Sequence, residues 1–154
     1  MRVYPTIELY RAKKVLITGG AGYVGSHLAQ KIGSVSNHVV CLDNYLSGRK
    51  SNHIEGVSYV EGDVNDIVEI LGSQKFDYIF HLGEYSRVEQ SLDEPHIALK
   101  NTYKSLVSLI EFWQSSGAKL LYSGSSTKFS DNGSGRHLSP YTAAKSLNTE
   151  LLVD

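Results

Sequence analysis

Two ionisable side chains near the end of the 154-residue chain are spaced for proton transfer. Tyr141 and Lys145 stand four residues apart, which places both on one face of a helix, one turn from each other. An ammonium group at that spacing favours the tyrosinate form of the phenol. A tyrosinate can act as a general base toward a hydroxyl group. The alternative is an ordinary amphipathic helix whose lysine extends its charged end into solvent.

A glycine-rich segment near the N-terminus has the spacing of a phosphate-binding turn. The apolar run at residues 15–17 is followed by Gly19, Gly22 and Gly25. Gly19 lets the strand turn sharply, and Gly22 lets the backbone approach a pyrophosphate without a Cβ atom. Gly25 lets the following helix pack closely on the strand. The alternative is a tight strand-to-helix turn that binds no ligand.

A helix is predicted to begin near Tyr23, directly after this turn. The first N–H groups of the helix, including that of Val24, lack acceptors within it, and the helix dipole favours an anion there. A pyrophosphate would therefore bind at this point. The next strand ends at Asp43, 18 residues after Gly25, a spacing that suits a carboxylate bound to a ribose 2′-hydroxyl. Because this carboxylate repels a 2′-phosphate and the adjacent Asn44 is not cationic, the pattern predicts NAD rather than NADP.

Composition narrows the class of protein. An apolar content of 41% is enough to build a core, and 154 residues suit one domain. A formal charge of −1 and the lack of a basic stripe argue against a nucleic-acid partner. No apolar run reaches membrane-spanning length and no signal peptide is evident, so we expect a cytoplasmic protein without a membrane partner. The histidines are scattered, and Cys41, the single cysteine, is predicted to fill the core, so no metal site is expected.

Strands and helices are predicted to alternate, which is typical of an α/β fold with a doubly wound parallel sheet. Strands are predicted at residues 14–18, 38–42, 57–60, 76–82 and 119–123. Helices are predicted at residues 23–32, 67–71, 94–116 and 139–154. Residues 1–12 fit no element and form an N-terminal extension, whereas residues 13–154 form the domain.

The longest predicted helix carries an apolar stripe. Its members recur at steps of three and four and are Leu99, Tyr103, Leu106, Ile110 and Trp113. Such a stripe buries one face of a helix. It packs either on its own sheet or on a second copy of the chain.

The glycine segment closely resembles that of the extended short-chain dehydrogenases/reductases, in particular the NAD-dependent epimerase/dehydratase family of nucleotide-sugar enzymes. The spacing G-x-x-G-x-x-G and the Tyr141–Lys145 pair both match this family. The resemblance covers residues 13 to 154. It implies a Rossmann-type sheet with strand order 3-2-1-4-5, NAD as the cofactor, a nucleotide-sugar substrate such as a UDP-sugar, and a homodimer built on the longest helix and the one after it.

The resemblance assigns catalytic roles. Ser125 matches the catalytic hydroxyl of the family, which stands four residues before an aromatic residue, here Phe129. Its hydroxyl would share the substrate oxygen with Tyr141. Tyr141 would take a proton from a sugar hydroxyl, and both Tyr141 and Lys145 would also lie against the cofactor.

The resemblance also assigns further cofactor contacts. Asp63, followed by Val64, matches the position that hydrogen-bonds the adenine, although capping of the next helix is an alternative role. Leu82 and Gly83 match the turn that lines the adenosine ribose. Asn101 matches an asparagine that relatives place near the cofactor.

The chain departs from the family pattern at three places. Residues 84–87, Glu-Tyr-Ser-Arg, stand where relatives have small residues, and Ser86 replaces a lysine found in some of them. The family's pyrophosphate contacts are therefore not carried over to this loop. The T-x-Y-G motif becomes residues 127–130, Thr-Lys-Phe-Ser. Members of the family are about twice as long, so the C-terminal substrate lobe is absent.

Two functions follow from these features. One is the cofactor-binding portion of an NAD-dependent nucleotide-sugar epimerase, which oxidises the sugar transiently at C4 and returns the hydride to the opposite face. The other is a non-catalytic NAD-binding module or fragment. A nucleotide-sugar 4,6-dehydratase is less favoured, because that reaction uses an Asp-Glu pair where this chain has Ser126 and Thr127.

Overall fold

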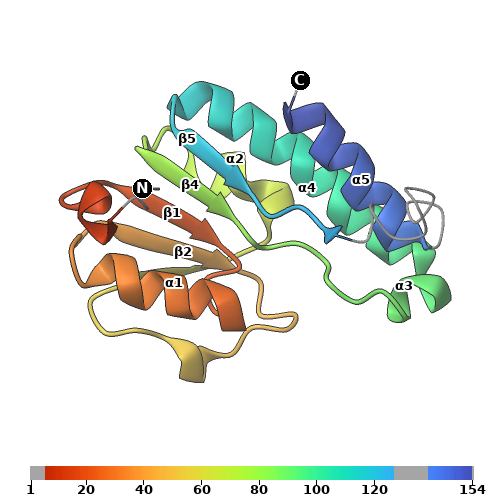
Figure 1. The fold of residues 1–154 in the computed structure, drawn as a ribbon, viewed down its shortest axis with the longest axis horizontal. Helices are drawn as coiled ribbons and strands as arrows, with labels where there is room; N and C mark the ends of the chain where they lie inside the picture. Colours follow the sequence, from red (N-terminus) through yellow and green to blue (C-terminus); the bar gives the residue numbers. More distant parts are fainter. Residues whose placement is uncertain (1–5, 127–138, 154) are drawn as a thin grey trace, which may run out of the picture.

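A five-stranded parallel sheet forms the centre of the computed structural model, which describes residues 6–126 and 139–153 (Figure 1). The strand order is β3-β2-β1-β4-β5, which confirms the predicted doubly wound order. The strands are β1 (Val15–Thr18), β2 (Val39–Asp43), β3 (Ser58–Glu61), β4 (Tyr78–His81) and β5 (Lys119–Tyr122). Parallel pairing brings the carboxyl ends of all five strands to one edge of the sheet.

Helices cover both faces of this sheet (Figure 1). They are α1 (Tyr23–Gly33), α2 (Ile67–Leu71), α3 (Gln90–Asp93), α4 (Pro95–Ser116) and α5 (Pro140–Val153). Three 3-10 turns complete the fold: η1 (Ile7–Tyr10), η2 (Lys50–Asn52) and η3 (Val64–Asp66). None of the helices that the structure describes is long and apolar enough to span a bilayer. The predicted last helix is confirmed to Val153, and residue 154 lies outside the described residues.

The sheet separates two apolar cores. Leu16 and Ile79 point to one side, where they pack with Phe112 of α4 and with α2. Val15 and Ile17 point to the other side and pack with α1. These β1 side chains are fully buried because both faces of the strand are covered by helices.

The buried face of α4 differs from the predicted apolar stripe, and that prediction was wrong. Of the stripe only Leu106 is buried, whereas its other four members are half-buried. The buried face consists of Ala98, Thr102, Ser105, Leu106, Leu109 and Phe112. The small polar residues belong to it because α5 lies beside α4 (Figure 1), and Asn148 of α5 donates a hydrogen bond to the Thr102 carbonyl at 3.2 Å.

Part of the N-terminal extension belongs to the fold, so the expectation that it fits no element was wrong. Residues Ile7–Tyr10 form η1, and the Tyr10 ring packs edge-on against Tyr78 and Phe80, with centroids 5.0 and 5.7 Å apart. A four-residue 3-10 turn is too short to produce a periodic pattern, so sequence analysis missed it. Residues 1–5 of the extension lie outside the described residues.

We predict that the 154-residue chain associates with itself through β5. This strand lies at one edge of the sheet, and its Leu121 is 50% exposed. Residues 119–122, which make up the strand, include no proline. Unpaired backbone groups at such an edge can recruit a second chain. Light scattering over a range of concentrations should show association that Leu121→Lys weakens and the control Val68→Lys on α2 does not. A stable monomer at every concentration would contradict the prediction.

Candidate functional site

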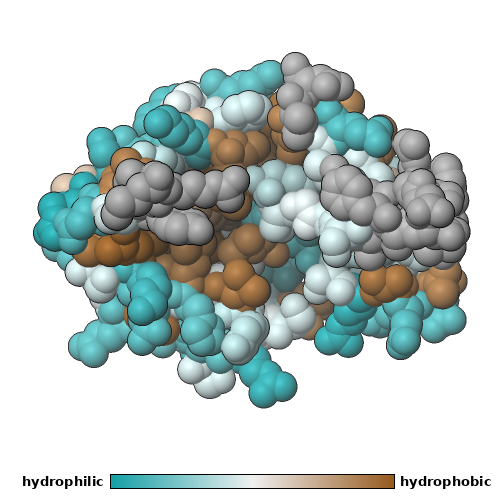
Figure 2. All heavy atoms as spheres, in the orientation of Figure 1, coloured by the Kyte–Doolittle hydropathy of each residue, from teal (hydrophilic) through white to brown (hydrophobic). Residues whose placement is uncertain are grey.

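A cavity of about 670 Å³ opens at the carboxyl edge of the sheet. Figure 2 shows this face of the molecule hollowed between the α1 side and the α3 side. The cavity is lined by twelve of the predicted cofactor residues: Gly19, Gly22, Tyr23, Val24, Gly25, Asp43, Asn44, Asp63, Val64, Leu82, Gly83 and Asn101. Its position is the usual ligand-binding place in a doubly wound sheet.

The turn between β1 and α1 needs glycine for two separate reasons. Gly19 has a φ of 72°, in the left-handed region that other residues rarely adopt. Gly25 packs so tightly that a Cβ atom there would lie 2.1 Å from the Gly19 carbonyl oxygen. The chain therefore turns sharply and brings the start of α1 to the end of β1, as the sequence predicts.

The N-terminus of α1 is open to the cavity. Tyr23 and Val24 line the cavity, and both are exposed, at 79% and 63%. Gly22 adds no side chain in front of their N–H groups. The first N–H groups of an α-helix have no acceptor within it, so this end can hold an anion such as a pyrophosphate.

The Asp43 carboxylate is held in place by backbone groups. Its Oδ2 accepts from the Ala21 N–H and its Oδ1 from the Tyr45 N–H, each at 2.8 Å. Gly48 lies so close that a Cβ atom there would be 2.8 Å from Oδ1. Each carboxylate oxygen keeps one lone pair for a further donor. A ribose hydroxyl in the cavity can supply that donor.

Asp63 has the capping role that the sequence offered as an alternative to an adenine contact, and it also binds Asn44. Its Oδ1 accepts from the Asn65 N–H at 2.8 Å and caps η3, whereas its Oδ2 accepts from the Asn44 side-chain amide at 2.8 Å. Both Asn44 and Asp63 line the cavity beyond Asp43. Val64 lines the same end of the cavity with a buried apolar side chain.

Thr18 joins the end of β1 to the turn after β4. Its Oγ1 accepts from the N–H groups of Leu82 and Gly83, at 3.2 and 3.1 Å. Both lone pairs are thereby used, so the hydroxyl donates to His81 Nδ1 at 2.8 Å. The contact with Thr18 turns the Nε2 atom of the buried His81 ring toward Glu84.

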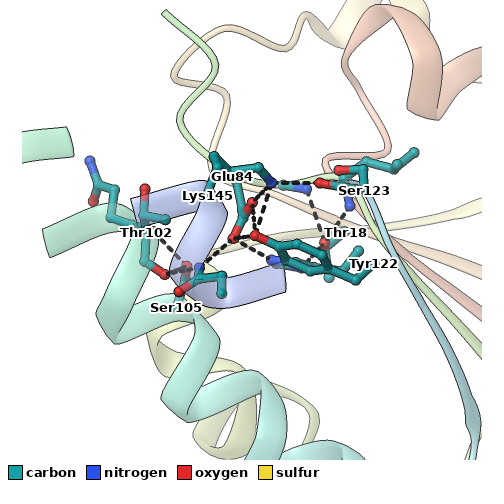
Figure 3. A network of polar contacts seen from close by, with 12 residues as sticks. Thr18, Glu84, Thr102, Ser105, Tyr122, Ser123 and Lys145 are labelled. Carbon is teal, nitrogen blue, oxygen red and sulfur yellow. Dashed lines mark hydrogen bonds and ion pairs between the residues drawn. The ribbon is translucent and has the colours of Figure 1, made fainter. Parts of the chain in front are cut away.

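Lys145 differs most from its predicted surroundings. It is 3% exposed, and its ammonium group donates to the Glu84 carboxylate, to the Tyr122 hydroxyl at 2.9 Å and to the Ser123 carbonyl at 2.5 Å (Figure 3). An ammonium group has three donors, so none remains for Tyr141 in this arrangement. Tyr141 lies on the same face of α5 and is half-buried, and neither it nor Lys145 lines the cavity.

Glu84 is the centre of this cluster and is a site residue that sequence reasoning missed. Its side chain is 4% exposed but lines the cavity. Besides Lys145, its carboxylate oxygens accept from the Tyr122 hydroxyl at 3.0 and 2.9 Å and from the Asn148 amide at 3.3 Å. His81 Nε2 lies 3.5 Å from Oε1. The only signal in the sequence was that Glu84 stands where the family has a small residue.

The protonation states in this cluster follow from burial and from neighbouring charge. Burial by itself raises the pKa of Glu84, but hydrogen bonding and charge from His81, followed by the charge and hydrogen bonding of Lys145, outweigh it, so the pKa lies below its usual value. Burial, followed by the Glu84 charge, raises the pKa of Tyr122. At neutral pH Glu84 is therefore ionised and Tyr122 keeps its proton.

Ser125 lies beyond the end of β5 and is half-buried, but it does not line the cavity. The lining residue from this strand end is instead Ser123. Phe129, which identified Ser125 in the sequence, lies with residues 127–138 outside the described residues.

Comparison with known proteins places the chain in a wider context. The sequence model of the NAD-dependent epimerase/dehydratase family matches residues 15–154. A UDP-glucose 4-epimerase from Streptomyces lividans is 30% identical over 145 residues, which are 86% of this chain and 44% of that enzyme.

Solved structures show the same fold. Epimerase Mth375 from Methanothermobacter thermautotrophicus superposes with a TM-score of 0.85 at 27% identity, over 95% of this chain and 48% of that one. The Bordetella bronchiseptica enzyme WbmF, solved in complex with NAD+, superposes with a TM-score of 0.81 at 26% identity, over 93% and 45%. The chain therefore spans less than half the length of each of these proteins.

Proposed function

Because the chain belongs to the NAD-dependent epimerase/dehydratase family, we propose that it is the cofactor-binding portion of an NAD-dependent nucleotide-sugar epimerase. One observation carries this proposal. The open N-terminus of α1 and the backbone-held Asp43 carboxylate face the same cavity, so an anion and a ribose hydroxyl can be bound side by side. Similarity to a UDP-glucose 4-epimerase supports the class of reaction.

The described residues supply a place for each part of NAD. The pyrophosphate binds at the N-terminus of α1, and Asp43 accepts from the adenosine ribose. The adenine lies toward Asn44 and Asp63, and the turn at Leu82 and Gly83 lines the ribose. The other nucleoside then lies toward the ends of β4 and β5.

The catalytic residues act on the sugar. The chemistry supplied by the bound cofactor is reversible acceptance of a hydride from the sugar C4. Tyr141 takes the proton of the C4 hydroxyl as general base, and Ser125 hydrogen-bonds the same oxygen. Lys145 lies one turn further along α5, where its charge is paired with Glu84.

A non-catalytic NAD-binding module is the second candidate. One observation favours it: the three Lys145 donors are taken by Glu84, Tyr122 and Ser123. We expect the 154-residue chain to bind NAD weakly and not to convert UDP-sugars. Turnover of a UDP-sugar by this chain would contradict the module.

Cofactor preference tests the proposal. We expect NAD to bind more than about tenfold more tightly than NADP, because the Asp43 carboxylate would repel a 2′-phosphate. Titration calorimetry measures both dissociation constants. Asp43→Ala should remove the preference, whereas the control Asp66→Ala, an exposed carboxylate outside the cavity, should keep it. Equal affinities in the unaltered chain would contradict the assignment of Asp43.

A further inference from the structure

We propose that Glu84 keeps the site from favouring the reduced cofactor, because its carboxylate cancels the positive charge of Lys145 beside the cavity; this inference rests on the proposed function. NAD+ carries a positive charge on its nicotinamide ring and NADH does not. A site with an uncompensated ammonium group near that ring would therefore favour NADH. The Glu84–Lys145 pair removes this bias.

The topology brings Glu84 to the nicotinamide half of the site. Asp43 ends β2, the anion-binding turn follows β1, Glu84 follows β4 and Ser123 follows β5. The strand order makes these positions successive along the carboxyl edge of the sheet. With one ribose at Asp43 and the pyrophosphate at α1, the second nucleoside lies beside Glu84 and Ser123.

The charges of Glu84 and Lys145 cancel. Glu84 contributes one negative charge and Lys145 one positive charge, and their side chains are each 4% exposed. Tyr122 keeps its proton. Asn148 completes the cluster as an uncharged amide. Because the pair is shielded from water, removal of either charge leaves a field that solvent screens poorly.

The ratio of the dissociation constants for NAD+ and NADH measures that field. Both forms share the adenosine, the pyrophosphate and the riboses, so contacts to those parts cancel in the ratio. A variant that is partly unfolded weakens both apparent affinities by the same factor. The ratio therefore separates an electrostatic role of Glu84 from a merely structural one.

Three variants of the 154-residue chain test the proposal, with NAD+ titrated by calorimetry and NADH by its fluorescence. Glu84→Gln should shift the ratio about tenfold toward NADH, since the Lys145 charge is then uncompensated. Lys145→Met should shift it in the opposite direction. The double variant should return to within about twofold of the unaltered chain. Glu69→Gln, which removes an exposed carboxylate of α2 that does not line the cavity, is the control and should leave the ratio unchanged.

The possible failures are distinguishable. The role of Glu84 would be overturned if Glu84→Gln left the ratio of the NAD+ and NADH dissociation constants unchanged. It would also be overturned if both single variants shifted that ratio in the same direction. In either case the proposed function stands. Failure of the unaltered chain to bind either form would overturn the proposed function and the role of Glu84 with it.

Discussion

Replacement of Tyr141 by phenylalanine is expected to lower kcat by about 10²- to 10⁴-fold, the usual contribution of a general acid–base group. The measurement needs a version of the protein extended to the length of its relatives, assayed with a UDP-sugar. The affinity for NAD should stay within about twofold, because the variant loses one hydroxyl and keeps the ring. Tyr141 is half-buried on α5 and does not line the cavity, so the pyrophosphate and ribose contacts are left intact.

A matched control is Tyr103→Phe, which removes a hydroxyl from a half-buried tyrosine on α4. This variant should keep its kcat. If Tyr141→Phe turned over substrate as fast as the control, α5 would have only a structural role. Loss of NAD binding in Tyr141→Phe would instead indicate damage to the fold rather than loss of a base.

Replacement of Gly25 by alanine is expected to lower the free energy of unfolding by about 3 kcal/mol and to abolish NAD binding. The added Cβ would lie 2.1 Å from the Gly19 oxygen and 2.9 Å from the Gly20 Cα. These are backbone atoms, so no side-chain rotation relieves the overlap. The start of α1 must move away from β1, which opens the turn that would hold the pyrophosphate. Urea denaturation and calorimetry measure the two effects.

Gly124→Ala is the control for the same chemical change. A Cβ there would meet only the Thr149 side chain, at 3.5 Å and beyond, which is ordinary contact. Its stability should change by no more than about 0.5 kcal/mol. Equal stability of the Gly25 and Gly124 variants would show that close packing at Gly25 is not required.

The fold class, the cofactor turn and about half of the residues that line the cavity could be predicted from the sequence. Each of these features depends on neighbouring residues along the chain. The period at which apolar residues recur indicates the strands and helices, and the spacing of Gly19, Gly22 and Gly25 indicates the turn. Asp43 is a local feature as well, because it ends the strand that follows the first helix. Parallel pairing then brings these strand ends to one edge without any further information.

The tertiary structure decided which partners the polar side chains take. Thr102 and Ser105 lie outside the predicted apolar stripe of α4, yet both are buried, and Asn148 of α5 packs on Thr102. Glu84 and Lys145 are 61 residues apart, and nothing in the sequence near either residue indicates the other as its partner. Their pairing arises because β4, β5 and α5 meet at one point, where a buried charge is stable only beside its opposite. No local pattern encodes that meeting, so sequence reasoning paired Lys145 with Tyr141, whereas the fold pairs it with Glu84.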